Sequence, residues 1–141
     1  MEKVNIEKQL IWKGCRDTNA ETNPVLMSAD GGALWANLPL YLSEVNHSPD
    51  GFEWGYNGSG PTQLAYAILR SYFEIVEELN IESARFQAQK FCFEFRQQFV
   101  SRWKKNEWKI DSEYIAIWIG GQKAGWFGDY NITSGSAVIR E

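Results

Sequence analysis

Residues 51–69, GFEWGYNGSGPTQLAYAIL, place a glycine-rich turn directly before an amphipathic helix, and this order constrains the chain more than any other segment. Gly55, Gly58 and Gly60 allow backbone angles that a side chain forbids, and Pro61 fits the first turn of a helix. The segment therefore predicts a helix that begins at Pro61. Because the first N–H groups of a helix have no partner within it, they are open here to an anion or to an acceptor side chain.

The apolar residues keep helical spacing from Pro61 to Leu79. Those that share one face of the predicted helix are Leu64, Ile68, Tyr72, Ile75 and Leu79. The opposite face carries three glutamates, Glu74, Glu77 and Glu78, as a solvent-exposed side requires. Asn80 is expected to end this helix.

A second helix is predicted from an N-cap at Ser83 to about Trp103. One apolar series in it is Ala88, Phe91, Phe95 and Phe99, and a second stripe, rotated well away from the first, is Phe86, Phe93 and Val100. The helix thus has two apolar faces. Either it lies between the sheet and another helix, which is the interpretation that we prefer, or one face meets a partner chain.

The first 42 residues carry strand patterns separated by turn residues. The turn Ala29-Asp30-Gly31-Gly32 lies between the apolar runs 25–28 and 33–35 and predicts a β-hairpin. Two more apolar runs are residues 9–12, closed by Gly14, and residues 38–42, which suit an edge strand or the approach to the polar loop 43–51.

The expected architecture is α+β: a small N-terminal antiparallel sheet of about three strands, packed by two long helices and one short helix. The short helix is predicted from Ser112 to Ile119, with Gly120 and Gly121 as its end. Length favours a single domain over residues 1–141, with a β-rich part and loop at 1–50, the glycine turn and helices at 51–119, and a Gly/aromatic C-terminal extension at 120–141.

The formal net charge is −4, but residues 85–109 carry seven Lys/Arg against two Asp/Glu. A solvated helix face explains this basic segment most simply, so nucleic-acid binding is disfavoured. The N-terminus has no secretory pattern and no apolar run long enough for a membrane span, and the two cysteines have no metal-like spacing. We therefore expect a cytoplasmic protein with no membrane contact.

The run from Asn46-His47-Ser48 through GFEWGYNGSGPTQLAYAIL resembles the signature of a small bacterial and phage domain family of unknown function. In that family a His-Ser-x-x-Gly-Phe segment precedes Trp-Gly-Tyr-Gly-Gly-Ser-Gly-Pro-x-Gln-Leu-Ala. The resemblance extends from Trp12 to Trp118 and leaves residues 122–141 as an extension. Asn57 stands where the family has glycine. The resemblance implies a phage or mobile-element context and supplies no activity.

His47 is the only histidine, and it lies near the predicted helix start. The candidate ligand-binding residues are Asn46, His47, Trp54, Tyr56, Gly58, Ser59, Gly60 and Gln63. A structural role is the preferred alternative for His47, whose imidazole would hydrogen-bond the loop backbone; as a catalytic residue it would act as general acid or base. The glycines also have a structural alternative to ligand binding, which is to let Trp54 and Tyr56 pack against the helix.

Neither a metal nor a cofactor is expected, because the sequence has no His/Cys cluster, no Asp-x-Asp loop and no nucleotide-binding glycine fingerprint. Seven Trp, six Tyr and eight Phe exceed what a core of this size needs, which favours an aromatic surface. Our preferred function is a non-enzymatic binding module for a protein or small anionic partner. The alternatives are a small enzyme acting on a phosphorylated or nucleotide-like ligand, and a self-associating subunit, possible as a homodimer.

Overall fold

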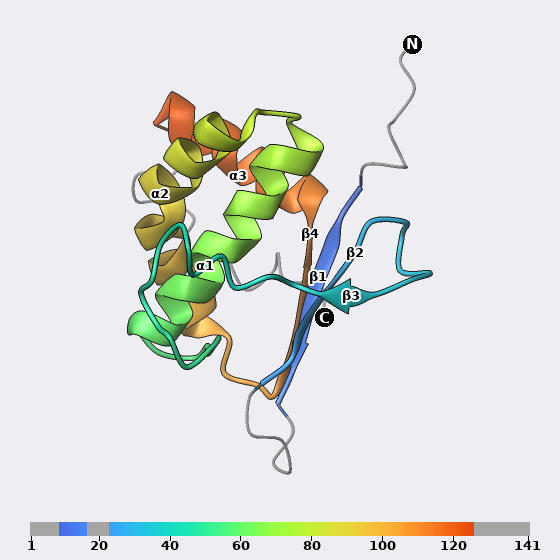
Figure 1. Cartoon of the computed structure of the whole chain (residues 1–141), viewed down its shortest axis with the longest axis vertical. Coiled ribbons are helices and arrows are strands. Elements are labelled where there is room, and N and C mark those ends of the chain that lie inside the picture. Colours follow the sequence, from blue (N-terminus) through green and yellow to red (C-terminus); the bar gives the residue numbers. More distant parts are fainter. Residues whose placement is uncertain (1–8, 17–22, 126–141) are drawn as a thin grey trace.

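The computed structural model describes residues 9–16 and 23–125. The elements in chain order are β1 (Ile11–Cys15), β2 (Val25–Ser28), β3 (Ala36–Asn37), α1 (Ser59–Ser71) with the π-helical turn η2 (Tyr72–Val76), α2 (Ile81–Gln98), the 3-10 turn η3 (Val100–Arg102), β4 (Glu107–Asp111) and α3 (Ser112–Ala124). Figure 1 shows the helices gathered on one side of the sheet. The predicted α+β class is confirmed.

The sheet has four strands in the order β3-β2-β1-β4, and all neighbouring strands are antiparallel. The predicted sheet lacked β4, which comes from the second half of the chain and pairs with β1 along its whole length, from Ile11–Asp111 to Cys15–Glu107. Its sequence, EWKID, alternates buried and exposed residues as a half-buried strand does. The sheet is therefore not wholly N-terminal.

β1 begins and ends two to three residues later than predicted, and it passes through Gly14 instead of ending there. The glycine has a packing role, because a Cβ atom at this position would lie 2.4 Å from Nε1 of Trp108. The indole of Trp108 thus lies flat against the strand backbone. A glycine inside a strand often marks such a close approach.

The predicted hairpin is confirmed, although its second strand begins at Ala36. The reason is the carboxylate of Asp30, whose Oδ1 accepts hydrogen bonds from the amides of Ala33 and Leu34 at 3.0 and 2.9 Å. Those residues close the loop and do not pair. Of the two interpretations of residues 38–42, the approach to a loop holds, since Tyr41 has a φ of 59°, which no strand residue adopts.

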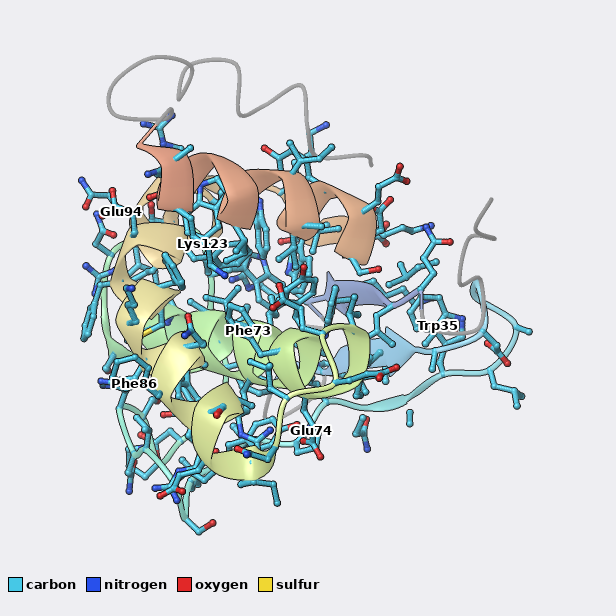
Figure 2. All side chains as sticks on the ribbon, turned by 90° about the horizontal axis from the view of Figure 1, so that it is seen from above. Trp35, Phe73, Glu74, Phe86, Glu94 and Lys123 are labelled. Carbon is cyan, nitrogen blue, oxygen red and sulfur yellow. The ribbon has the colours of Figure 1, made fainter. Side chains whose placement is uncertain are left out.

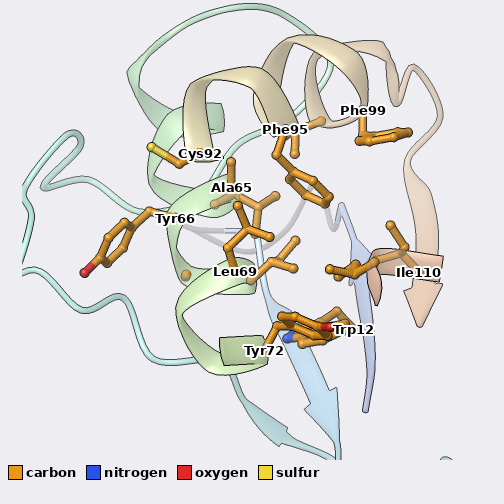
Figure 3. Packing of buried hydrophobic residues seen from close by; sticks show 14 of the residues in the cluster. Trp12, Ala65, Tyr66, Leu69, Tyr72, Cys92, Phe95, Phe99 and Ile110 are labelled. Atoms are coloured by element: carbon orange, nitrogen blue, oxygen red, sulfur yellow. The ribbon is translucent and has the colours of Figure 1, made fainter. Parts of the chain in front are cut away.

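α1 is the central element, and every residue from Gly60 to Ser71 is buried. One side packs on α2, and another packs on the sheet, where Nε1 of Trp12 donates to Oγ of Ser71 at 3.0 Å. Figure 3 shows Leu69 amid the core side chains, and Tyr66 pointing away from them toward the loop that follows β3. The helix is thus held by packing on several sides.

The helix caps differ from those predicted. Asn80, not Ser83, is the N-cap of α2, and its Oδ1 accepts the amide of Ser83 at 2.8 Å. α3 is capped by Asp111, which accepts the amide of Tyr114 at 2.9 Å. Gly120 and Gly121 lie inside α3, which ends at Gly125, a residue with a left-handed φ of 78°. Most of the predicted C-terminal extension, residues 126–141, lies outside the described residues.

The second face of α2 is not covered, which corrects the preferred sandwich interpretation. Phe86 is 66% exposed and Phe93 is 46% exposed, and Figure 2 shows Phe86 on the outer side of α2. Val100 does not share this face, because it lies in η3 after the helix has ended and is fully buried. Most of the described aromatic residues belong to the core, so the aromatic surface is much smaller than expected.

Within residues 9–16 and 23–125, no helix combines the length and apolar character that crossing a membrane requires.

Candidate functional site

A loop of residues 38–58, here named the wrapping loop, crosses α1 before entering it (Figure 1). Gln63 fixes this loop from a fully buried position in the helix. Its Oε1 accepts the amides of His47 at 2.7 Å and Ser48 at 3.2 Å, and its Nε2 donates to the carbonyls of Leu40 at 2.7 Å and Val45 at 2.9 Å. Both donors and both acceptor positions of the amide are thereby used. Gln63 therefore holds the loop and has no group left for a ligand.

Glu44 makes a second attachment between the wrapping loop and α1. Its carboxylate accepts Nε of Arg70 at 2.7 Å, NH2 of Arg70 at 2.9 Å and the Tyr66 hydroxyl at 2.8 Å, while Glu74 takes NH1 of Arg70 at 2.6 Å. The Arg70 side chain is only 3% exposed. Burial raises the pKa of Glu44, but the hydrogen bonds from Arg70 and Tyr66 outweigh burial and leave that pKa below its usual value.

The glycine turn, the last part of the wrapping loop, is held against the chain between α2 and β4. Gly55 has a φ of 96°, which suits glycine, and its amide donates to the carbonyl of Val100 at 3.0 Å. Other atoms approach Gly58 and Gly60 closely. A Cβ atom on Gly58 would lie 2.5 Å from the Tyr56 ring, and one on Gly60 would lie 2.7 Å from Cβ of Glu53. The glycines thus have a packing role, whatever else they do.

Two predicted aromatic site residues lie in different environments. Trp54 is 1% exposed, donates through Nε1 to the carbonyl of Lys105 at 3.1 Å and packs edge-on against Trp108. It belongs to the core. Tyr56 is 49% exposed and covers Gly58, and Asn46 is exposed on the wrapping loop.

The start of α1 has a positive charge from α2 beside it, while the carboxylate of Glu53, whose Cβ approaches Gly60, is paired with Arg16. The N-cap of α1, Gly58, provides no capping side chain, the first turn contains no acidic residue, and the amides of Ser59 and Gly60 have no acceptor among the described residues. Oγ1 of Thr62 accepts NH1 of Arg96, from α2, at 2.8 Å. A cation at the positive end of the helix dipole is unfavourable, and a bound anion would reverse that effect.

His47 and Phe93 lie beside this arginine. The imidazole packs edge-on against the Phe93 ring with centroids 5.5 Å apart, and the Arg96 guanidinium lies 5.5 Å from the same ring. Burial, followed by the charge of Arg96, lowers the pKa of His47, so its imidazole is neutral at pH 7. Nε2 of His47 and Nε of Arg96 are both buried without a hydrogen-bond partner in the described part of the chain.

We name His47, Thr62, Phe93 and Arg96 the α1-start cluster. Of the predicted site residues, the structure brings His47, Gly58, Ser59 and Gly60 to this region, and the carbonyl of Gly58 accepts a 2.7 Å hydrogen bond from Oγ1 of Thr62. Trp54 and Gln63 serve the core and the loop attachment. Sequence analysis assigned Phe93 to a contact stripe and did not select Arg96. No local pattern joins Arg96 to Thr62, which is 34 residues earlier.

Among the described residues, no group of three or more His, Cys, Asp or Glu side chains is placed to hold a metal ion.

A model of a family of unknown function, DUF6166, matches residues 12–121. The match covers the sheet, the wrapping loop, α1, α2 and most of α3. Neither a curated protein nor a solved structure matches the chain.

Proposed function

Since the chain belongs to the family of unknown function DUF6166, whose description assigns no activity, we propose its function from the geometry: it is a non-enzymatic binding module for a protein partner. The observation that carries this proposal is the exposed Phe93 ring between His47 and Arg96, at a helix start that lacks a capping side chain. The partner contributes an apolar side chain to Phe93 and a carboxylate to Arg96 and the unpaired amide of Ser59.

The apolar half of the contact rests on exposure. Phe86 and Phe93 lie seven residues apart on one face of α2, and both keep about half or more of their surface in water. Aromatic side chains supply much of the energy of protein interfaces, and they do so best when a partner excludes water from them. These two rings give the partner a site of two helical turns.

The anionic half rests on donors that have no acceptor. Arg96 is partly exposed and forms no ion pair within the described residues, and the amide of the exposed Ser59 lacks an acceptor there. A carboxylate from a partner would supply the missing acceptor, and hydrogen bonds to charged groups are the stronger ones. The same chemistry fits a small anionic ligand, but such a ligand alone would leave Phe86 exposed.

The test is recovery of partners from a host lysate with tagged protein, followed by mass spectrometry. A specific partner is expected with the wild type, and it should be lost with Phe93→Ser and strongly reduced with Arg96→Gln. Matched controls remove an exposed apolar residue and an exposed cation elsewhere, Ile117→Ser and Arg102→Gln, and should retain the partner. Equal recovery with Phe93→Ser and Ile117→Ser would refute this interface.

We also propose, from the resemblance in its sequence, that the chain is encoded by a phage or mobile element and acts in the cytoplasm. A host protein is then the expected partner, and the chain would inhibit that protein by binding it, without any catalysis. A genome neighbourhood of phage or transfer genes would support this origin, and one of housekeeping genes would contradict it.

An enzyme with His47 as acid or base is the second candidate, favoured by the lowered pKa of that residue. A neutral imidazole at pH 7 is the form that a general base requires. If His47→Gln keeps the melting temperature and abolishes turnover of a small molecule that co-purifies with the protein, the enzyme is supported. If that variant keeps turnover, His47 is not the base.

A further inference from the structure

The sheet has a second face, which the helices do not cover (Figure 1). Trp12, Trp108 and Ile110 of β1 and β4 point to the helices and are buried. Because side chains alternate along a strand, Lys13 and Lys109 point to the other side. At the end of these two strands this face is hollowed, with a volume of about 710 Å³.

The hollow is lined by three lysines, Lys13, Lys105 and Lys109. Lys13 and Lys109 are directly opposite each other in the antiparallel pairing of β1 and β4. Like charges in this arrangement repel and destabilise a sheet. No ion pair between described residues involves any of the three lysines. Within the described part of the chain, the three lysines therefore line one hollow without an ion-paired carboxylate.

Lys13 is also positioned by an aromatic ring. Its Nζ lies 4.1 Å from the centroid of the Trp35 ring, and the Trp35 indole is itself fixed by a 3.0 Å hydrogen bond to the carbonyl of Gly32. A cation held over an indole loses less freedom when it binds a ligand. The Lys13 ammonium is thus partly ordered before a ligand binds.

Among the described residues, one carboxylate lines the hollow, that of Glu107, and its Oε2 lies 3.7 Å from Sγ of Cys15. Asp111, two residues after Lys109 on the same strand face, is used by the α3 cap. Three lysines against one glutamate leave the lining with an excess of positive charge on a chain whose net charge is −4. This local excess of positive charge favours the binding of an anion.

We propose that this hollow binds a compact anion with at least two negative charges, of the pyrophosphate type. Two charges are required because one must lie between Lys13 and Lys109, whose strands are about 5 Å apart, while the other reaches Lys105. A free diphosphate and the diphosphate group of a nucleotide share this chemistry. The site is separate from the α1-start cluster, since the two share no residue.

The experiment is calorimetric titration of the full chain with inorganic pyrophosphate at low ionic strength. Lys109→Gln is expected to weaken binding at least tenfold, and the control Lys90→Gln, which removes the same charge from the exposed side of α2, should change it less than twofold. If the two variants lose affinity equally, the general field of the protein explains the binding and the site is refuted.

Two further readouts locate the anion and assign its source. Amide NMR shifts on adding pyrophosphate should centre on Gly14 and Lys109; shifts centred on Ser59 and Gly60 would overturn the proposal. Without anion, Lys109→Gln should melt at a higher temperature than the wild type, because the repulsion is gone, and a lower melting temperature would contradict that cause. In titrations with ADP, binding tighter than that of pyrophosphate assigns a nucleotide as the source of the diphosphate, and weaker binding assigns a free diphosphate.

Discussion

Replacing Gln63 with leucine removes four hydrogen bonds that join α1 to the wrapping loop. Each bond contributes about 0.5–1.5 kcal/mol net, so the free energy of unfolding should fall by about 2–6 kcal/mol. The upper part of this range applies if the loop stays in place, because two amides and two carbonyls then remain buried without partners. If the loop detaches, water satisfies these groups and the loss lies near the lower end.

Urea unfolding measures the loss, and Gln97→Leu, at an exposed position of α2, is the matched control with an expected change below about 0.5 kcal/mol. Hydrogen exchange then separates the two cases. In the detached case the amides of His47 and Ser48 exchange much faster in the Gln63→Leu variant, while amides in the middle of α1 keep their protection. A loss below about 1 kcal/mol, with both loop amides still protected, would show that Gln63 does not hold the loop.

Glu44→Gln should destabilise the protein at pH 7 and much less at pH 3. Because folding lowers the pKa of Glu44, its carboxylate stabilises the fold above the unfolded pKa, and this contribution is lost as pH falls through the folded pKa. Urea unfolding at both pH values measures the two losses of stability, and equal losses would contradict the prediction. Gly14→Ala brings a Cβ within 2.4 Å of the Trp108 indole and should lower the free energy of unfolding by about 1–3 kcal/mol. Gly120→Ala, where a Cβ meets open space in α3, should raise that free energy by as much as about 1 kcal/mol. The two melting temperatures should therefore move in opposite directions. Asn80→Ala removes the α2 cap and should cost about 1 kcal/mol, measured by thermal unfolding, and an unchanged value would mean that another group caps the helix.

The parts of the fold that sequence predicts well are those with a local cause. The apolar period of residues 61–79 depends on neighbours within one helix, and the Asp30-Gly31 turn brings together strands that are adjacent in the chain. The helix begins at Ser59, two residues before its predicted start, and its π-helical turn ends at Val76, three residues before Leu79. The second strand of the hairpin begins one residue after its predicted end. Sequence places the N-cap of a helix only to within one to three residues. Asn80 and Ser83 both suit an N-cap, and only the backbone geometry decides between them.

What sequence missed depends on distant contacts. β4 is a five-residue strand whose partner, β1, is about 95 residues earlier, and nothing in its own sequence names that partner. Gly120 and Gly121 do not end α3, although a glycine costs a helix about 1 kcal/mol, and the helix continues to Ala124. The two faces of α2 were visible in the sequence, but which of them stays uncovered was decided by the placement of α1.

The candidate site shows the same division. Sequence placed His47 near the start of α1, but the role of Gln63 became clear only when its four partners were known. Arg96 reaches Thr62 because α2 packs against α1, which no spacing rule predicts. That His47, Ser59 and Gly60 bind a ligand stays a prediction.

The complete burial of residues 60–71 has a consequence for how members of the family diverge. A segment enclosed on all sides tolerates few replacements, regardless of what the molecule binds. The buried sequence GPTQLA, residues 60–65, is then a requirement of assembly, independent of what the chain binds. Differences in specificity are expected instead at Phe86 and Phe93, where the outer surface of α2 is free to vary.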